Sequence, residues 1–283
     1  ISAMAKQPNK PGVNKSNPAT RPVPGTPPRQ ATAKAQGSAA SDDSFFSRNI
    51  QFFIVAGIAV VTYLSYQACL SNKLTNWDDL GYIINNALIK DPSPDAIRNI
   101  FSLAHPVMGN YHPLTILLYY FEYAKYGLDP WIYHFDSVIL HILVTIAVYF
   151  FVRLLSRRTI VAAVTALLFG LHPMHVESVA WAAGRKDVLY GLFFILSCAT
   201  WVLYLRKSGK AKIVWYVAGL VLFALSLLSK SVAVSLPVTL FAIDYFEKRK
   251  WQWLWIIEKL PHFALSLIFG LLSVNAQKDV GAM

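Results

Sequence analysis

Seven apolar runs, separated by polar connections, constrain the fold of this chain more than any other feature of its sequence. The first, residues 50–70, carries no charged side chain over 21 residues. A helix rises about 1.5 Å per residue, so this run is long enough to cross the roughly 30 Å hydrocarbon core of a bilayer. The other runs occupy residues 131–155, 160–171, 188–205, 213–228, 232–246 and 263–274. We therefore predict an all-α integral membrane protein, a helical bundle of about seven spans of which the third, sixth and seventh are short.

The composition agrees with membrane insertion and excludes an ordinary soluble domain. Hydrophobic residues make up 55% of the chain, charged residues make up 14%, against about 25% in a typical soluble domain, and the mean hydropathy is +0.42. The formal net charge of +11 is high enough for a nucleic-acid binder, but such a protein does not carry several membrane-length apolar runs, so we expect no nucleic-acid partner. Cys69 and Cys198 both lie inside apolar runs, so neither a disulfide framework nor a four-cysteine metal site can form.

Residues 1–44 differ in composition from the rest of the chain. They are rich in Pro, Lys, Gln, Ser and Ala and contain almost no large apolar side chain, so we predict a disordered tail. Six scattered basic residues either stay solvated or tether this tail to anionic lipid. The apolar run that follows is long enough to span a bilayer, which favours an uncleaved anchor over a cleaved signal peptide. We expect a single membrane module over residues 45–283.

Lysine and arginine are concentrated in alternate connections between the apolar runs. They gather at residues 153–158, 206–212 and 248–259. By the positive-inside rule, these connections and the N-terminal tail are cytoplasmic. The opposite side then holds a long first outer loop, residues 71–130, with an interfacial helix at 114–126, the connection 172–187 and the turn at Lys230. Five of the seven histidines lie in or beside these outer segments, so we expect the polar chemistry on this side.

Two adjacent carboxylates, Asp78 and Asp79, lie a few residues past the outer end of the first apolar run. A carboxylate there can act as a general base if it is partly desolvated and within hydrogen-bond reach of an acceptor hydroxyl. The alternative is structural, since Thr75, Asn76 or Asp78 can cap a helix that begins near Asp79. Adjacent helical residues point about 100° apart, so only one of the two acids can face a given acceptor. Spacing alone leaves both roles open.

The densest group of polar residues is the segment 172–187, between the third and fourth apolar runs. It contains His172, His175 and Glu177, which are residue types that ligate divalent metals, although their order is not that of the H-E-x-x-H metalloprotease motif. A metal site and an ordinary helix-end position are both open. His112 is one of three histidines that precede a proline, so it either points outward from the edge of a loop or is an ordinary surface or helix-end histidine.

Three basic side chains on the outer side are suited to bind an anion. Arg185 and Lys186 follow Gly184, and there an arginine offers phosphate oxygens a bidentate fork and a lysine offers them a point charge. Lys230 lies between the fifth and sixth apolar runs. The alternatives are an interfacial anchor in which the first two cations pair with Asp187, and a Lys230 side chain that snorkels to the membrane surface.

The order of these motifs resembles that of the transmembrane and tetratricopeptide-repeat-containing (TMTC-like) O-mannosyltransferases and their bacterial relatives, which are GT-C glycosyltransferases. The stretches that carry the resemblance are Trp77-Asp78-Asp79, Tyr111-His112-Pro113-Leu114-Thr115, His172 to Trp181, Gly184-Arg185-Lys186-Asp187 and Leu228-Ser229-Lys230. The resemblance covers residues 50–283, and the block from His172 to Asp187 is its most specific part.

The resemblance implies a GT-C fold and transfer of a sugar, mannose in this family, from a polyprenyl-phosphate donor to Ser or Thr hydroxyls of proteins on the lumenal or periplasmic face. It implies that Asp78, with Asp79 beside it, is the base of a single inverting displacement. The residues that would stabilise the departing phosphate are Arg185, Lys186 and Lys230, and those that would position substrates are His112, His172, His175 and Glu177. The implied partners are the lipid-linked sugar, an acceptor protein and the bilayer. A divalent metal stays open, because metal dependence differs among GT-C enzymes.

Two features of the sequence limit what the resemblance implies. The chain has no repeat with a period of about 34 residues, so we expect either a fragment that lacks the later spans and repeats or a module that acts with another chain. The basic, proline-rich tail favours a bacterial inner-membrane protein with a periplasmic site over an endoplasmic reticulum protein with a lumenal site. Two other functions stay as alternatives, a ligase or polymerase of lipid-linked glycans and a non-catalytic membrane scaffold.

Overall fold

The computed structural model describes residues 40–278, with side chains from residue 49, and contains helices but no β-strand within that part of the chain. The tail expected to be disordered lies outside the described residues, apart from residues 40–44, which begin the first helix. The seven apolar runs form α1 (Ala40–Tyr66), α5 (Pro130–Ser156), α6 (Thr159–Gly170), α8 (Arg185–Arg206), α9 (Gly209–Ser229), α10 (Leu236–Phe246) and α11 (Leu254–Lys278).

The connections also contain short helices. The first long loop forms the π-helical turn η2 (Leu80–Ile84), α2 (Ala87–Lys90), α3 (Ala96–Ile100) and α4 (Pro113–Tyr126). The connection between α6 and α8 forms η3 (Pro173–His175), α7 (Val176–Ala180) and η4 (Ala182–Gly184), while η1 (Gln67–Ser71) follows α1 and η5 (Ser231–Ser235) follows α9. The helix expected near 114–126 is therefore present as α4.

Five helices in the described part of the chain are long and apolar enough to cross a membrane, fewer than the seven spans predicted. They are Asn49–Ser71, Pro130–Ser156, Ala182–Arg206, Gly209–Ser229 and Leu254–Lys278. A sixth span is present if α6 and the segment Pro173–Ala180 count as one, with a bend of 50° between them. The chain bends there because a proline disfavours helical backbone in the residue before it. The run at 232–246 forms only a shorter apolar helix, Ser231–Phe246. The all-α membrane bundle is confirmed, and the count of spans is five or six.

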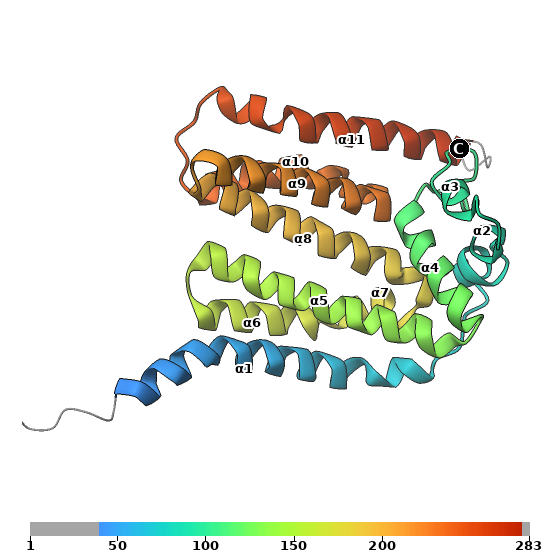
Figure 1. Cartoon of the computed structure of the whole chain (residues 1–283), viewed down its shortest axis with the longest axis horizontal. Coiled ribbons are helices and arrows are strands. Elements are labelled where there is room, and N and C mark those ends of the chain that lie inside the picture. The colour runs from blue at the N-terminus through green and yellow to red at the C-terminus, as the bar shows by residue number, and fades with distance from the viewer. Residues whose placement is uncertain (1–39, 279–283) are drawn as a thin grey trace, which may run out of the picture. The chain divides into compact units, whose positions relative to one another are not determined.

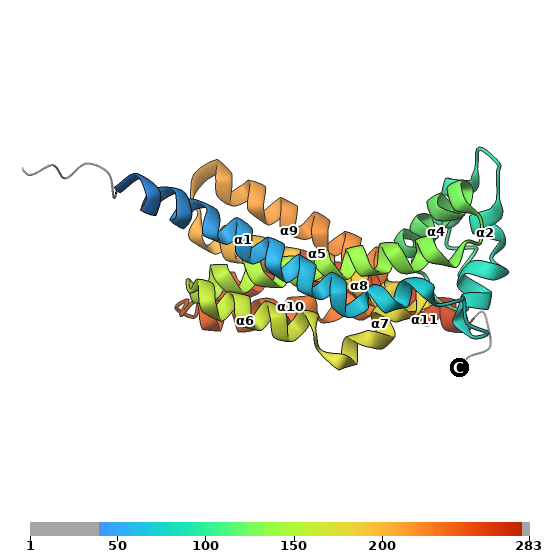
Figure 2. The same cartoon turned by 90° about the horizontal axis from the view of Figure 1, so that it is seen from below.

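The apolar helices lie side by side, and their connections gather at two ends (Figure 1). We call the end with α2, α3 and α4 the loop end, and Figure 2 shows the same gathering from a second direction. We call the other end the basic end, because it holds the Lys- and Arg-rich connections at residues 156–159, 206–209 and 246–254. Alternate connections therefore lie at opposite ends of the bundle, as their difference in Lys and Arg content predicts.

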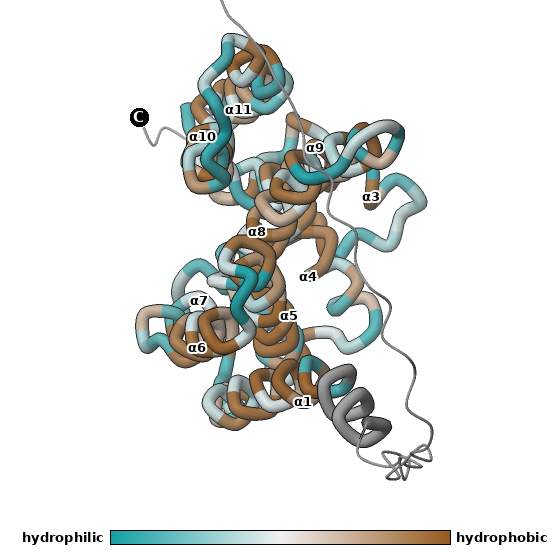
Figure 3. Tube along the Cα trace, turned by 90° about the vertical axis from the view of Figure 1, so that its left-hand side faces the viewer, coloured by the Kyte–Doolittle hydropathy of each residue, from teal (hydrophilic) through white to brown (hydrophobic). Residues whose placement is uncertain are grey.

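Large apolar side chains stay exposed along the helices. Phe52, Ile160 and Ile213 are 68%, 79% and 65% exposed. A soluble protein rarely tolerates extended apolar surface of this kind, whereas lipid tails are as apolar as these side chains. Figure 3 shows hydrophobic residues concentrated along the helices and hydrophilic residues concentrated in the connections. The described helices thus have the surface of a membrane bundle.

Three buried clusters hold the bundle together. One joins α1, α5 and α6 and includes Tyr149. A second joins the first long loop to α4 and α5 around Tyr82 and Tyr119. A third joins α8, α9 and α10 and includes Trp201 and Phe223. The second cluster positions the site described next, because it also contains residues of η4 and so holds the first long loop against the start of α8.

Candidate active site

The two adjacent acids lie at the loop end, where the chain enters the π-helical turn η2. Such turns are rare and are often found at functional sites. The two side chains have different surroundings, because Asp79 is 0% exposed whereas the Asp78 side chain is 22% exposed. The structure therefore separates two carboxylates that spacing alone leaves equivalent.

Asp79 holds the first long loop against the start of α8. Its Oδ2 accepts hydrogen bonds from the backbone N–H of Thr75 (2.7 Å) and from the Thr75 hydroxyl (2.9 Å). Its Oδ1 accepts a hydrogen bond from the backbone N–H of Ala183 (2.8 Å), in η4. Asp79 stands at the N-cap position of η2 but makes no side-chain capping bond to it. Its oxygens are engaged by three donors in the interior, so this carboxylate is positioned for a structural role.

Asp78 faces Lys186, the second residue of α8. The Lys186 Nζ lies 3.1 Å from Asp78 Oδ2, and the Lys186 side chain is 12% exposed. The same ammonium lies 4.3 Å from the centroid of the Tyr82 ring and 5.6 Å from that of Trp181, within the range of cation–π attraction. A carboxylate and a cation thus stand side by side at a partly open surface.

A second ion pair follows directly on α8. Lys230 Nζ pairs with Asp187 Oδ1, and the two side chains are 22% and 32% exposed. Lys230 is the residue after α9, and the Thr115 hydroxyl of α4 donates a hydrogen bond to the Ser229 carbonyl (2.9 Å), which fixes the end of α9 against α4. The predicted cations Lys186 and Lys230 are therefore brought to one place, each beside an acid.

Arg185 lies on the opposite side of the same helical turn, and the structure does not place it where the phosphate prediction requires. Its side chain is 0% exposed and its guanidinium pairs with Glu122 of α4. It also donates hydrogen bonds to the Ser137 hydroxyl (3.1 Å) and to the Tyr133 carbonyl of α5. Consecutive helical side chains point about 100° apart, so Lys186 faces the surface when Arg185 faces the interior. The guanidinium holds three helices together.

His112 precedes α4 and lies beside both ion pairs. It is 4% exposed, and its Nδ1 has no hydrogen-bond partner in the described part of the chain. Burial, together with the positive charges of Lys186 and Lys230, lowers the pKa of His112 to about 3. The imidazole is therefore neutral at physiological pH, and it can donate or accept a hydrogen bond without adding charge to the site. His112 therefore stays a candidate for positioning substrate beside the two lysines.

The other two predicted histidines lie on the α6–α8 connection. His172 Nδ1 accepts a hydrogen bond from the backbone N–H of Met174 (3.2 Å), so His172 caps η3. The His175 ring centroid lies 4.4 Å from that of Phe169 and 5.6 Å from that of His141. Both histidines are thus engaged locally, one with the backbone and one with neighbouring rings.

Glu177 lines an open pocket of about 700 Å³ together with Lys73, Trp77 and Trp181. The Trp181 ring lies between this pocket and the Asp78 site, because the Lys186 ammonium, which pairs with Asp78, is 5.6 Å from the ring centroid. Within the residues that the structure describes, no three His, Cys, Asp or Glu side chains gather in a group that could hold a metal ion.

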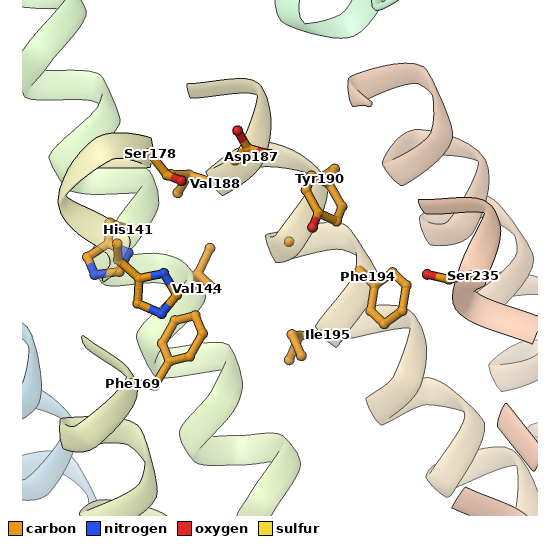
Figure 4. Close-up of a pocket in the computed structure, with 12 residues that line it drawn as sticks. His141, Val144, Phe169, Ser178, Asp187, Val188, Tyr190, Phe194, Ile195 and Ser235 are labelled. Atoms are coloured by element: carbon orange, nitrogen blue, oxygen red, sulfur yellow. The ribbon is translucent and has the colours of Figure 1, made fainter. Parts of the chain in front are cut away.

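An apolar cavity of about 320 Å³ adjoins the second ion pair, because Asp187 is part of its lining. Its walls come from α5, α6 and α8 and include Val144, Phe169 and Ile195. Figure 4 shows Asp187 at one end of the cavity and Ser235, from η5, on the side away from α5. The cavity is mostly apolar, and the carboxylate of Asp187 at one end belongs to the second ion pair.

Two residues at the site carried no prediction from the sequence. Tyr82 lies four residues after Asp78, so this spacing was a usable signal that the two side chains lie near each other, and Lys186 contacts both of them. Glu122 gave no such signal, because it is 63 residues from Arg185 in the chain. Only the packing of α4 on α8 brings that pair together.

No family model matches this chain, and no solved structure matches it. Curated proteins do match it. Protein O-mannosyl-transferase TMTC2 from Homo sapiens is 35% identical to it over 106 residues, 38% of this chain. Protein O-mannosyl-transferase TMTC1 from Homo sapiens is 32% identical over 148 residues, 50% of this chain. The chain is similar in sequence to these TMTC proteins over the matched stretches.

The TMTC-like match extends to Protein O-mannosyl-transferase TMTC4 from Homo sapiens, which is 28% identical over 179 residues, 56% of this chain. The matched stretches amount to 13%, 17% and 24% of the lengths of these three relatives. The TMTC-like chain therefore spans a minor part of each relative, and protein O-mannosyl transfer is what the names of those relatives state.

The two acids should respond differently to loss of charge. Asp79→Asn replaces an interior oxygen that accepts hydrogen bonds, which should lower the free energy of unfolding by about 1–3 kcal/mol. Asp78→Asn removes a partly exposed ion pair, which is worth roughly 0–1 kcal/mol. Thermal unfolding of both variants in detergent measures the difference. A larger loss of stability for Asp78→Asn than for Asp79→Asn would contradict the structural role of Asp79.

His112 should make the stability of the protein depend on pH. Its pKa falls from 6.5 to about 3 on folding, so the unfolded chain takes up this proton first as the pH decreases. The free energy of unfolding should therefore lose up to about 1.4 kcal/mol per pH unit below the unfolded-state pKa, and nothing above it. A His112→Gln variant should lose less stability between neutral and acidic pH. Identical pH dependence of unfolding in the two proteins would show that His112 is not held neutral.

Proposed function

We propose that this chain is the membrane module of a glycosyltransferase that moves a sugar from a polyprenyl-phosphate donor to a Ser or Thr hydroxyl of a protein. The observation that carries the proposal is the juxtaposition of the Asp78–Lys186 pair and the Lys230–Asp187 pair at the loop end. The names of the TMTC relatives support mannose as the sugar and a protein as the acceptor.

The two lysines are suited to the phosphate of the donor. Each is neutralised by a carboxylate in the protein, and each pair is partly exposed. A phosphate that enters between them would take over hydrogen bonds that the lysines now make to Asp78 and Asp187. Positive groups fixed where negative charge develops are commonly the largest contribution to catalysis of group transfer. Arg185 contributes indirectly, by fixing the start of α8 through Glu122.

The apolar cavity is suited to the first part of the donor's isoprenoid chain. It ends at Asp187, whose partner is Lys230, so a lipid tail within it would carry its phosphate toward the lysines. Its wall residues Val144, Phe169 and Ile195 would contact the isoprenoid tail with uncharged, apolar side chains.

Asp78 is suited to act as the base. In a single inverting displacement, the acceptor oxygen bonds to the anomeric carbon of the sugar while the bond from that carbon to the phosphate oxygen breaks. The hydroxyl proton passes to Asp78, and the bonding electron pair leaves with the polyprenyl phosphate, which gains a negative charge that Lys186 and Lys230 stabilise. As Lys186 turns from Asp78 to the phosphate, the carboxylate becomes free to accept the proton.

The open pocket beside Trp181 is suited to the acceptor. It shares the Trp181 ring with the Lys186 ammonium, and it offers Glu177, Lys73 and the exposed Trp77 to a polypeptide. Trp77 is 75% exposed, which leaves its ring available to an apolar side chain of the acceptor. A Ser or Thr held in this pocket would approach Asp78 from the side opposite the lipid cavity.

The proposal places the loop end on the lumenal or periplasmic side of the membrane. The basic end carries the Lys- and Arg-rich connections, which are retained on the cytoplasmic side during insertion. A bacterial inner membrane, with the site facing the periplasm, and the membrane of the endoplasmic reticulum, with the site facing the lumen, both satisfy this orientation.

Transfer of labelled mannose from a short-chain polyprenyl-phosphate donor to Ser/Thr peptides tests the function. Asp78→Asn should lower kcat by about 10²- to 10⁴-fold, because it removes the proton acceptor, while the KM for the donor changes less. Asp79→Asn should lower stability more than it lowers kcat of the folded fraction. Wild-type transfer with an unchanged kcat in Asp78→Asn would sink the role of this carboxylate.

Asp129→Asn is the matched control for the loss of a loop carboxylate. Asp129 lies in the same first long loop and accepts a hydrogen bond from the backbone N–H of Trp131 (3.1 Å) at the start of α5. Asparagine caps helices about as well as aspartate, so this variant should keep both stability and transfer rate. An equal loss of rate in Asp129→Asn and Asp78→Asn would indicate a general effect of loop charge.

A further inference from the structure

Two buried polar atoms without hydrogen-bond partners lie at the candidate active site. They are the hydroxyl of Tyr82, a residue that is 1% exposed, and Nδ1 of His112, which is 4% exposed. Buried polar groups are nearly always hydrogen-bonded in native proteins, and those that are not call for an explanation such as a missing ligand. Both atoms belong to residues that lie next to Lys186. Their position suggests that a ligand completes the site.

The surroundings of Tyr82 are charged on several sides. The Lys186 ammonium lies over its ring, 4.3 Å from the centroid. Burial, together with the negative charges of Asp78 and Asp187, raises the pKa of the Tyr82 hydroxyl, so this group stays protonated and remains a donor. Asn110 lies close to this hydroxyl, and its amide donates a hydrogen bond to the Met108 carbonyl (2.9 Å).

The backbone holds Tyr82 in this position. Tyr82 lies inside the π-helical turn η2, and the Asn86 amide donates a hydrogen bond to the Tyr82 carbonyl (3.0 Å). On the other side, a Cβ added to Gly81 would come within 2.3 Å of the Met108 sulfur, so the loop around Met108 packs directly on this turn. The hydroxyl is therefore held in place before any ligand arrives, which reduces the entropy lost on binding.

We propose that Tyr82 binds the donor directly, with its hydroxyl donating a hydrogen bond to a non-bridging oxygen of the donor lipid's phosphate beside Lys186. This inference rests on the proposed function, and it adds a neutral donor to the two lysines at the same site. A phosphodiester oxygen is an acceptor only, so it matches the protonated tyrosine hydroxyl, whereas the adjacent carboxylates are acceptors and would match a ligand group that donates hydrogen bonds. The neutral His112 ring can then contact a ligand hydroxyl without changing the charge of the site.

The test measures binding of a short-chain polyprenyl phosphate without sugar to the full chain in lipid nanodiscs. Tyr82→Phe deletes the hydroxyl and keeps the ring under Lys186. A hydrogen bond to a charged oxygen is worth about tenfold or more in affinity, so Tyr82→Phe should raise Kd for this lipid by about tenfold or more. Its melting temperature should not fall, because the variant removes a buried group that has no hydrogen-bond partner among the described residues.

Tyr149→Phe is the matched control. The Tyr149 hydroxyl is likewise buried and without a partner in the described part of the chain, but Tyr149 lies in the α1–α5–α6 cluster, in the half of α5 nearer the basic end. It should bind the lipid phosphate with a Kd within about twofold of the wild-type value. An equal change of Kd in Tyr149→Phe and Tyr82→Phe would overturn the inference, as would a wild-type Kd in Tyr82→Phe.

Two further binding experiments distinguish a failure of this inference from a failure of the proposed function. The affinity for the sugar-bearing donor should fall in Tyr82→Phe by the same factor as the affinity for the sugar-free lipid. A loss confined to the sugar-bearing donor would show that Tyr82 contacts the sugar and not the phosphate, and it would overturn the assignment. Inorganic phosphate at millimolar concentration should compete poorly with the lipid in the wild type. A wild-type protein that binds no polyprenyl phosphate would overturn the proposed donor, whereas wild-type binding that Tyr82→Phe leaves intact would overturn only the role of Tyr82.

Discussion

The buried pair of Arg185 with Glu122 is the interaction on which the candidate site depends. The guanidinium is fully buried and lies 4.9 Å from the centroid of the Tyr119 ring, so it is held by charge and by aromatic contact together. Removing one partner of such a pair typically costs about 3–5 kcal/mol, because the other charge is left buried alone. The pair fixes the first turn of α8 against α4, and this sets the direction of the next two residues, Lys186 and Asp187. Arg185, which the sequence marks as a candidate for binding phosphate, thus orients the two residues that follow it.

Charge balance explains how the site can be stable before substrate binds. Lys186 and Lys230 each face a carboxylate, and the neutral His112 adds nothing, so the group has no net charge. In the proposed mechanism, a donor phosphate would bring one negative charge and compete with Asp78 and Asp187 for the lysines. This competition would couple the two substrates, because the same event that binds the donor would free Asp78 to accept the proton of the acceptor hydroxyl.

Much of the fold followed from hydropathy, whereas the details of the site depended on contacts between distant segments. The all-α bundle and the helix at α4 followed from apolar runs, but the number of spans did not, because the chain bends between the run at 160–171 and Pro173, and the segment 231–246 is too short. Asp78 and Asp79 could not be told apart from spacing, since the donor that distinguishes them is the N–H of Ala183, 104 residues away. The inward orientation of the Arg185 side chain likewise depends on its pairing with Glu122, and no local sequence pattern links these two residues.

The most direct test of the central claim is a structure of the full chain with a polyprenyl-phosphate donor bound. The account predicts that the phosphate lies between the ammonium groups of Lys186 and Lys230, within hydrogen-bond distance of the Tyr82 hydroxyl, and that the isoprenoid chain follows the cavity lined by Phe169 and Ile195. A phosphate bound at the basic end, or at the loop end with both lysines still paired to Asp78 and Asp187, would contradict it.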